Sequence, residues 1–249
     1  MPRYKISIEF NGTRYSGWQK QPNSNTVEEE IESALSQILP HPIDVIGQGR
    51  TDSGVHAEEQ VAHFDFPDTL DPGKMLYALV GVLPHDIAVW DIRQVSDDFH
   101  ARFDATSRCY RYQIIRRPAP LLRSVSEMVL DDLDLDALHY CAQKVEGTHN
   151  FDSFTKPDNE NPDSVCEVRH SSFTEDDYLL CYHIEANRFV RHLVRRLVGT
   201  MIEVGKGKRT LENFVDMIEK PSKQKNGHGA AAQGLILEKV KFEKSQNNS

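Results

Sequence analysis

Three polar side chains, one of them a carboxylate capable of acid–base or nucleophilic chemistry, follow one another between glycines in the segment 47–54. They are Arg50, Thr51 and Asp52, and strand-like sequence flanks the segment on both sides. Loops held on a rigid sheet commonly display reactive groups, and an aspartate there can act as a nucleophile or a general base. An isolated Thr-Asp-x-Gly usually only closes a tight turn. Here the loop is longer than a hairpin needs and places an arginine beside the carboxylate, which favours a catalytic centre.

Hydrophobic periodicity indicates the elements that must hold this loop. Strands are predicted at 3–10, 43–46, 60–66, 88–95, 110–115 and 178–185. Helices are predicted from a capping box of Thr26 and Glu29 to Pro40, from Asp71 to Val82, and from Asp134 or Asp136 to Gly147. The chain therefore divides into two halves, each with helices and strands, and one half gives way to the other near residue 100.

The most regular helical pattern follows, with apolar residues from Phe189 at a period of 3.6 down to Gly205. Arg188, Arg191 and Arg195 are three and four residues apart, so they are expected to share one face of this helix. Such a face is either solvated or directed at a functional site.

The basic residues are segregated, although the chain as a whole is acidic. Its 249 residues carry 29 Lys and Arg against 38 Asp and Glu, a net charge of −9. The segment 101–123 nevertheless holds six arginines against one aspartate, and 188–209 holds seven bases against one glutamate. If folding joins these segments they form a positive cleft suited to RNA. The alternative is two ordinary solvated faces, and charge alone does not decide between them.

Length and composition exclude several classes of protein. The size allows one large domain or two small ones, and the longest charge-free apolar stretch, 75–84, is about half of the roughly 20 residues that a membrane span requires. The first residues enter a strand pattern directly, so we expect a cytoplasmic protein. The four cysteines form no Cys-x-x-Cys pair, and His56 and His63 are too far apart for one helix face, so no metal site is expected.

Five segments in order along the chain carry a more specific signal. From the N-terminus they are 15–21 before a helix start; 49–57, Gly-Arg-Thr-Asp-Ser-Gly-Val-His-Ala; 99–103 followed by 108–112; 187–199; and 234–235. Together, over Arg3 to about Phe242, the chain resembles the tRNA pseudouridine synthase A family. One departure is Ala231, where the resemblance leads us to expect proline, and this affects the shape of the loop expected to contact the base.

The resemblance implies an α+β protein with the pseudouridine synthase fold. Two α/β subdomains of mixed and antiparallel sheet, with helices on one face, would flank an active-site cleft. Residues 1–100 would form the half with the catalytic aspartate loop, and residues 101–243 the half with the tyrosine and arginine of the cleft. Residues 244–249 would be a polar tail.

The resemblance also implies an isomerase that converts uridine to pseudouridine at positions 38–40 of the tRNA anticodon stem-loop. That reaction breaks the bond from ribose C1′ to uracil N1 and joins C1′ to C5, and it needs no cofactor and no metal. The expected partners are tRNA and a second copy of the chain, as a homodimer in the cytoplasm, with no membrane.

Carried onto this sequence, the resemblance nominates Asp52 as the catalytic carboxylate, as a nucleophile at C1′ or a base at C2′. The substrate-binding residues would be Tyr110, which stacks on uracil, Arg195, which keeps Asp52 ionised, and Leu235, which contacts the base. Arg50 would fill the space left by the flipped nucleotide. The other arginines expected to bind RNA are Arg102, Arg108, Arg111 and Arg191.

Two other functions fit parts of the sequence. A noncatalytic RNA-binding module would share the basic segments but has no use for a carboxylate in the cleft. A glycosidase-like hydrolase would cut the same N-glycosidic bond, but it would require paired carboxylates about 5 to 9.5 Å apart. The signature supplies only Asp52.

Overall fold

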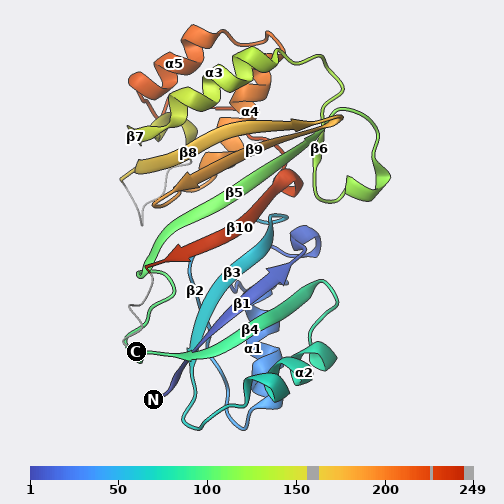
Figure 1. Ribbon diagram of the computed structural model, residues 1–249, viewed down its shortest axis with the longest axis vertical. Coiled ribbons are helices and arrows are strands. Elements are labelled where there is room, and N and C mark those ends of the chain that lie inside the picture. The colour runs from blue at the N-terminus through green and yellow to red at the C-terminus, as the bar shows by residue number, and fades with distance from the viewer. Residues whose placement is uncertain (156–162, 225–226, 244–249) are drawn as a thin grey trace. The chain divides into compact units, whose positions relative to one another are not determined.

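The computed structural model describes residues 1–155, 163–224 and 227–243. The chain forms two compact units. Unit 1 comprises Met1–Thr106 together with the segment from Leu237 onward, and unit 2 comprises Ser107–Ile236. Helices and a mixed sheet make this an α+β protein, as expected (Figure 1).

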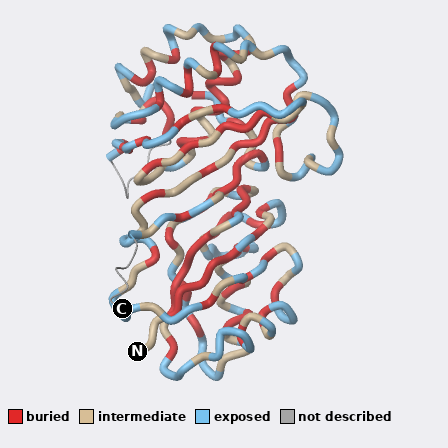
Figure 2. The backbone as a smooth tube through the Cα atoms, in the orientation of Figure 1, coloured by how far each residue is buried: buried red, intermediate tan, exposed pale blue. Residues whose placement is uncertain are grey.

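Unit 1 is built on antiparallel strands, in the order β4-β1-β3. Its elements are β1 (Arg3–Phe10), α1 (Val27–Ile38), β2 (Ile46–Gly47), β3 (His56–Asp65), α2 (Pro72–Val82) and β4 (Ile87–Val95), with a 3₁₀ turn at Gly12–Arg14. In β1, Ile6 lies between Ala62 of β3 and Ile92 of β4, and all three are buried. Helix α2 packs on β4 and α1 packs on α2, and Figure 2 shows the buried residues along β1 and β3.

Unit 2 contains a second antiparallel series, in the order β5-β9-β8-β7, with β6 parallel to β5. The strands are β5 (Ala105–Ile115), which enters the unit at Ser107, β6 (Glu127–Met128), β7 (Gly147–Asn150), β8 (Val165–Asp176) and β9 (Leu179–Ala186). The helices are α3 (Leu135–Val145), α4 (Leu193–Gly205) and α5 (Leu211–Glu219), with 3₁₀ turns at Pro120–Leu122, Asp152–Phe154 and Ala232–Gly234. Helix α3 packs on β8, and α3, α4 and α5 pack on one another (Figure 1). Strand β10 (Leu235–Phe242) begins in unit 2 and continues into unit 1.

The start of α1 differs from the predicted capping box. The helix begins where expected, but the Thr26 side chain makes no capping hydrogen bond and is fully buried. The first N–H groups instead donate to backbone carbonyls of the segment 15–18, as described below. Tertiary packing thus replaces the side-chain cap.

The predicted strand 43–46 is mostly not a strand, since only Ile46 and Gly47 pair with β3. The Ile43 N–H donates to Ser36 Oγ (2.8 Å) and the Val45 N–H to Glu32 Oε1 (3.1 Å). Side chains of α1 therefore take the backbone donors that a neighbouring strand would otherwise have paired.

The prediction that α4 begins near Phe189 and carries three arginines on one face is wrong. His192 adopts the left-handed conformation (φ 64°) and the helix begins at Leu193. Arg188 and Arg191 therefore precede the helix, and only Arg195 lies on it. The segment before the helix is held by other contacts, including the Thr155 hydroxyl, which donates to the Arg191 carbonyl (3.0 Å). These contacts override the helical period of the sequence.

Five other elements were not predicted at all, namely α5, β6, β7, β8 and β10. The polar tail 244–249 lies outside the described residues. Within the described part of the chain, no helix has both the length and the apolar character needed to cross a membrane.

Candidate active site

The loop that carries Asp52 lies in unit 1 between β2 and β3. At its centre is a β-turn, in which the Val55 N–H donates to the Asp52 carbonyl (3.1 Å). Gly54 has a φ of 78° at the third position of that turn, which favours glycine. Thr51 is buried and Asp52 is half-buried. The carboxylate is therefore carried on a tightly folded backbone.

The segment 15–18 braces this loop. The Trp18 N–H donates to the Thr51 carbonyl (3.3 Å), and the Gly54 N–H donates to the Tyr15 carbonyl (3.3 Å). Gly17 has a φ of 98°, and a Cβ there would lie 2.4 Å from the Thr51 carbonyl oxygen. Only glycine allows the backbone to approach so closely in this conformation. Two segments that are separate in the sequence, 15–21 and 49–57, are thus parts of one structure.

Helix α1 fixes the bracing segment in turn. The Val27 and Glu28 N–H groups donate to the carbonyls of Gly17 (3.2 Å) and Trp18 (3.0 Å). The Trp18 side chain is buried, and its Nε1 donates to Glu28 Oε1 (3.1 Å). Burial raises the pKa of Glu28. A Cβ at Gly47 would lie 2.4 Å from Trp18 Nε1, so the indole fills the space next to the end of β2.

Arg50 is exposed on the same loop. The residue before it is pinned, because the buried Gln60 of β3 donates from Nε2 to the Gly49 carbonyl (3.0 Å). The loop therefore presents an arginine at its surface, two residues before Asp52.

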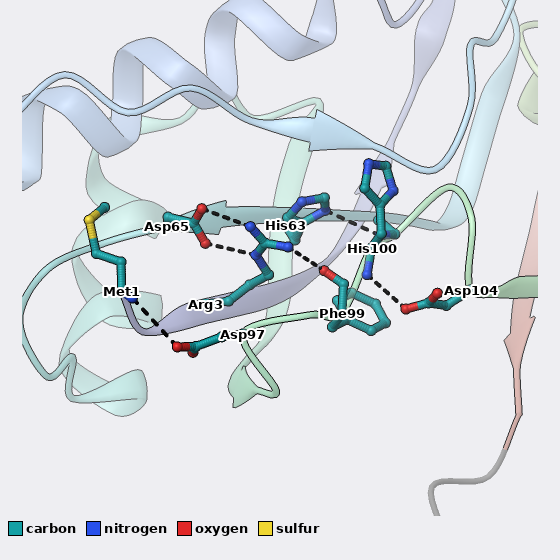
Figure 3. Close-up of polar contacts among 9 residues, drawn as sticks. Met1, Arg3, His63, Asp65, Asp97, Phe99, His100 and Asp104 are labelled. Carbon is teal, nitrogen blue, oxygen red and sulfur yellow. Dashed lines mark hydrogen bonds and ion pairs between the residues drawn. The ribbon is translucent and has the colours of Figure 1, made fainter.

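Polar side chains of unit 1 hold the turn 99–104 that follows β4 (Figure 3). The Arg3 guanidinium donates to both carboxylate oxygens of Asp65 (2.7 and 2.8 Å) and to the first carbonyl of the turn (2.7 Å). The Ala101 N–H donates to Nδ1 of His63 (3.2 Å). Burial, with a smaller contribution from Arg3, lowers the pKa of His63 to about 4. The ring is therefore neutral at pH 7 and can accept this hydrogen bond.

His100 and Asp104 close the same turn. The His100 N–H donates to Asp104 Oδ2 (2.7 Å), and His100 Nδ1 accepts from the Arg102 N–H (3.2 Å). Arg102 itself is exposed. Its backbone is thus fixed while its side chain lies at the surface, which suits a residue that contacts a polyanion.

Tyr110 lies on β5 in unit 2 and is 9% exposed. Its ring packs edge-on against Phe189, with centroids 5.1 Å apart and an interplanar angle of 86°. Alternation along the strand puts Arg108 and Tyr112 on the same face as Tyr110 and puts Arg111 on the opposite face. Arg108 Nη1 donates to the Asn187 carbonyl (2.8 Å). The arginines predicted to bind RNA on this strand are therefore divided between its two faces.

Arg195 lies in the first turn of α4 and is tied to the loop 227–235. Its Nε donates to the Ala230 carbonyl (2.9 Å), and the Ala230 N–H donates to the Arg195 carbonyl (2.9 Å). A Cβ at Gly199 would lie 2.3 Å from the His228 carbonyl oxygen, so the helix and the loop are in close contact. Leu235 ends the loop and is buried. The structure thus places Arg195 and Leu235 at the same loop.

Two residues that the sequence did not single out, Tyr112 and Glu127, also hold this loop. Tyr112 is fully buried, and its hydroxyl donates to Glu127 Oε2 and lies 2.8 Å from the Ala231 carbonyl oxygen. The Ala231 N–H donates to the same Glu127 oxygen (3.1 Å). No sequence pattern links residues 112, 127 and 231, because they meet only in the folded unit.

Comparison with known proteins decides the family. A model of the family described as tRNA pseudouridine synthase matches residues 6–104 and 141–243. The chain belongs to the tRNA pseudouridine synthase family. The matched ranges include the Asp52 loop, Arg195 and Leu235, whereas β5 and Glu127 lie between them.

Curated relatives cover nearly the whole chain. A tRNA pseudouridine synthase A of Bacteroides thetaiotaomicron is 40% identical over 97% of this chain and 91% of its own length. One from Chlorobium phaeovibrioides is 36% identical over 97% of this chain and 100% of its own length. One from Myxococcus xanthus is 37% identical over 96% of this chain and 92% of its own length. The likeness therefore extends through β5 and β6 as well.

Proposed function

We propose that this protein converts uridine to pseudouridine at positions 38–40 of the tRNA anticodon stem-loop, with Asp52 as the catalytic carboxylate. Family membership supports the reaction class. The single observation that carries the assignment to Asp52 is the brace around its loop, in which Gly17 lies against the Thr51 carbonyl. A merely turn-closing aspartate has no need of such a brace, whereas catalysis requires a carboxylate held in one geometry.

The reaction rearranges bonds within one nucleotide. The bond from C1′ to N1 breaks, the uracil turns in the site, and C5 joins C1′ while the C5 proton is lost and N1 gains one. The Asp52 carboxylate assists either as a nucleophile that forms and then releases a bond to C1′, or as a base at C2′. Both routes require the carboxylate to be ionised near neutral pH.

The remaining site residues serve this step. Arg195 offsets the cost of burying the Asp52 charge against the sugar. Tyr110 stacks on the detached uracil, and Leu235 contacts the base. Arg50 occupies the space that the target nucleotide leaves when it flips out of the RNA, and its exposed position on the Asp52 loop suits that role.

Exposed and half-buried arginines of both units bind the RNA backbone. They are Arg102, Arg108, Arg111 and Arg191. Such contacts position the RNA and carry little sequence information, so recognition rests on the shape of tRNA. We further propose a homodimer that acts in the cytoplasm. Residues 1–100 carry the Asp52 loop, and residues 101–243 carry Tyr110 and Arg195.

The test is the variant Asp52→Asn, with Asp44→Asn as the matched control, since Asp44 is an exposed aspartate of the same unit. Nucleoside analysis by mass spectrometry should find no pseudouridine in tRNA treated with Asp52→Asn, although tRNA binding persists, and a normal level with Asp44→Asn. Normal product from Asp52→Asn would refute the assignment. Release of free uracil by the native protein would indicate a hydrolase, and binding without any product would indicate a noncatalytic module.

A further inference from the structure

We propose that Glu127 and Tyr112 are positioning residues for the reaction, because they fix the loop 227–235 and thereby orient the guanidinium of Arg195. The inference rests on the proposed role of Arg195. It assigns a task to two residues that lie outside the ranges matched by the family model.

Glu127 is the anchor of the loop. It lies in β6, and the parallel pairing of Ile114 with Glu127 fixes its backbone. One carboxylate oxygen accepts both from the Tyr112 hydroxyl and from the Ala231 N–H (3.1 Å). Hydrogen bonds to a charged acceptor are about twice as strong as neutral ones, so this oxygen holds Ala231 firmly.

Tyr112 supports the same loop at two points. Burial and the nearby Glu127 carboxylate raise the pKa of Tyr112, so its hydroxyl remains a donor throughout the neutral range. The ring lies directly against the end of the loop, since a Cβ at Gly234 would lie 2.5 Å from Tyr112 Cζ. The residue just before Leu235 is therefore also set by Tyr112.

A single residue, Ala230, links the anchored Ala231 to Arg195. Ala230 precedes Ala231 and makes two hydrogen bonds with Arg195, one to its backbone carbonyl and one from its Nε (2.9 Å each). Since Nε lies in the guanidinium plane, this bond limits the orientations of the charged group. Movement of Ala231 would therefore turn the guanidinium.

Tyr112→Phe makes the idea testable while the ring stays in place against Gly234. It removes the hydroxyl that donates to Glu127 and lies 2.8 Å from the Ala231 carbonyl oxygen. Glu127→Gln, in contrast, keeps an acceptor oxygen, while Glu127→Ala removes it.

The experiment compares single-turnover pseudouridine formation and tRNA binding for these variants. Glu219→Ala is the control, because Glu219 is an exposed glutamate of the same unit. We expect Glu127→Ala to lower the rate by about 10- to 100-fold with tRNA affinity within about 2-fold, as for a small misplacement of a catalytic group. Glu127→Gln should recover most of the rate, and Tyr112→Phe should lose a smaller part of it than Glu127→Ala.

A double-mutant cycle separates this proposal from the proposed function. If Glu127 acts through Arg195, then Glu127→Ala should cause little further loss in an Arg195→Lys background. An unchanged rate in Arg195→Lys alone would refute the role of Arg195 itself. A large loss in Arg195→Lys with a native rate in folded Glu127→Ala would refute only the positioning role. If thermal melting shows that Glu127→Ala is unfolded, Tyr112→Phe decides, and a native rate in folded Tyr112→Phe would overturn the proposal.

Discussion

Replacing Gly17 by alanine tests whether the brace around the Asp52 loop sets the activity. The new Cβ would lie 2.4 Å from the Thr51 carbonyl oxygen, whereas an ordinary contact begins at 3.4 Å, so the loop must retreat by about 1 Å. A displacement of about 1 Å in a catalytic group costs on the order of 100-fold in rate. The φ of 98° adds a backbone cost of about 1–2 kcal/mol in folding stability.

The assay for Gly17→Ala combines single-turnover pseudouridine formation, tRNA binding and chemical denaturation. We expect a folded protein that is destabilised by about 1–3 kcal/mol, binds tRNA normally and forms product about 100-fold more slowly. Gly81→Ala in α2 is the control, because a Cβ at Gly81 meets nothing within 4 Å. A native rate in folded Gly17→Ala would show that the position of the Asp52 loop is not set by the brace.

Three further predictions concern other parts of the structure. The pKa of His63 is lowered to about 4 in the folded protein, so the contribution of His63 to folding stability should be full above its unfolded pKa near 6.5 and decline as the pH falls toward 4. Chemical denaturation of His63→Asn across that pH range should show a shallower decline in stability. A decline equal to that of the native protein would contradict the lowered pKa. Arg102→Ala should weaken tRNA binding and reduce the log–log salt slope by about one unit, and an equal slope would place Arg102 outside the RNA path. Gly199→Ala, whose Cβ would lie 2.3 Å from the His228 carbonyl oxygen, should lower both the melting temperature and the product rate, and a native rate would show that the contact between α4 and the loop 227–235 is not needed.

The sequence predicts the parts of the fold that depend on local pattern. Helix α2 begins at Pro72 as expected, because the Asp71 side chain accepts from the N–H groups of Gly73 and Lys74. All the residues of this cap are neighbours in the sequence. Alternation likewise identifies β1 and most of β9. These elements are determined by neighbours in the sequence, so no knowledge of the tertiary structure is required.

The parts that fail depend on distant contacts. The start of α4 is displaced to Leu193 by the left-handed His192, which interrupts an apolar period that otherwise continues unbroken. In the same way, α1 is capped by carbonyls of the segment 15–18 and not by Thr26. Periodicity shows which face of a helix is apolar. It does not show which tertiary contacts determine or cap the start of the helix.

The candidate site shows the same division. The Asp52 loop is visible in the sequence because its glycines and charged residues are contiguous. The sequence does not show the need for Gly17 or the convergence of Tyr112, Glu127 and Ala231. Each of these contacts joins segments that are far apart in the chain. Resemblance to a family nominates the reacting residues, whereas the residues proposed to orient them are found only in the structure.

The central claim, that Asp52 of this protein performs the isomerisation in tRNA, is tested most directly in cells that lack the protein. Their tRNA is mapped by mass spectrometry after the native chain or Asp52→Asn is supplied at equal levels. We expect pseudouridine at positions 38–40 with the native chain and unmodified uridine with Asp52→Asn. Pseudouridine at those positions with Asp52→Asn, or its absence with the native chain, would contradict the assignment.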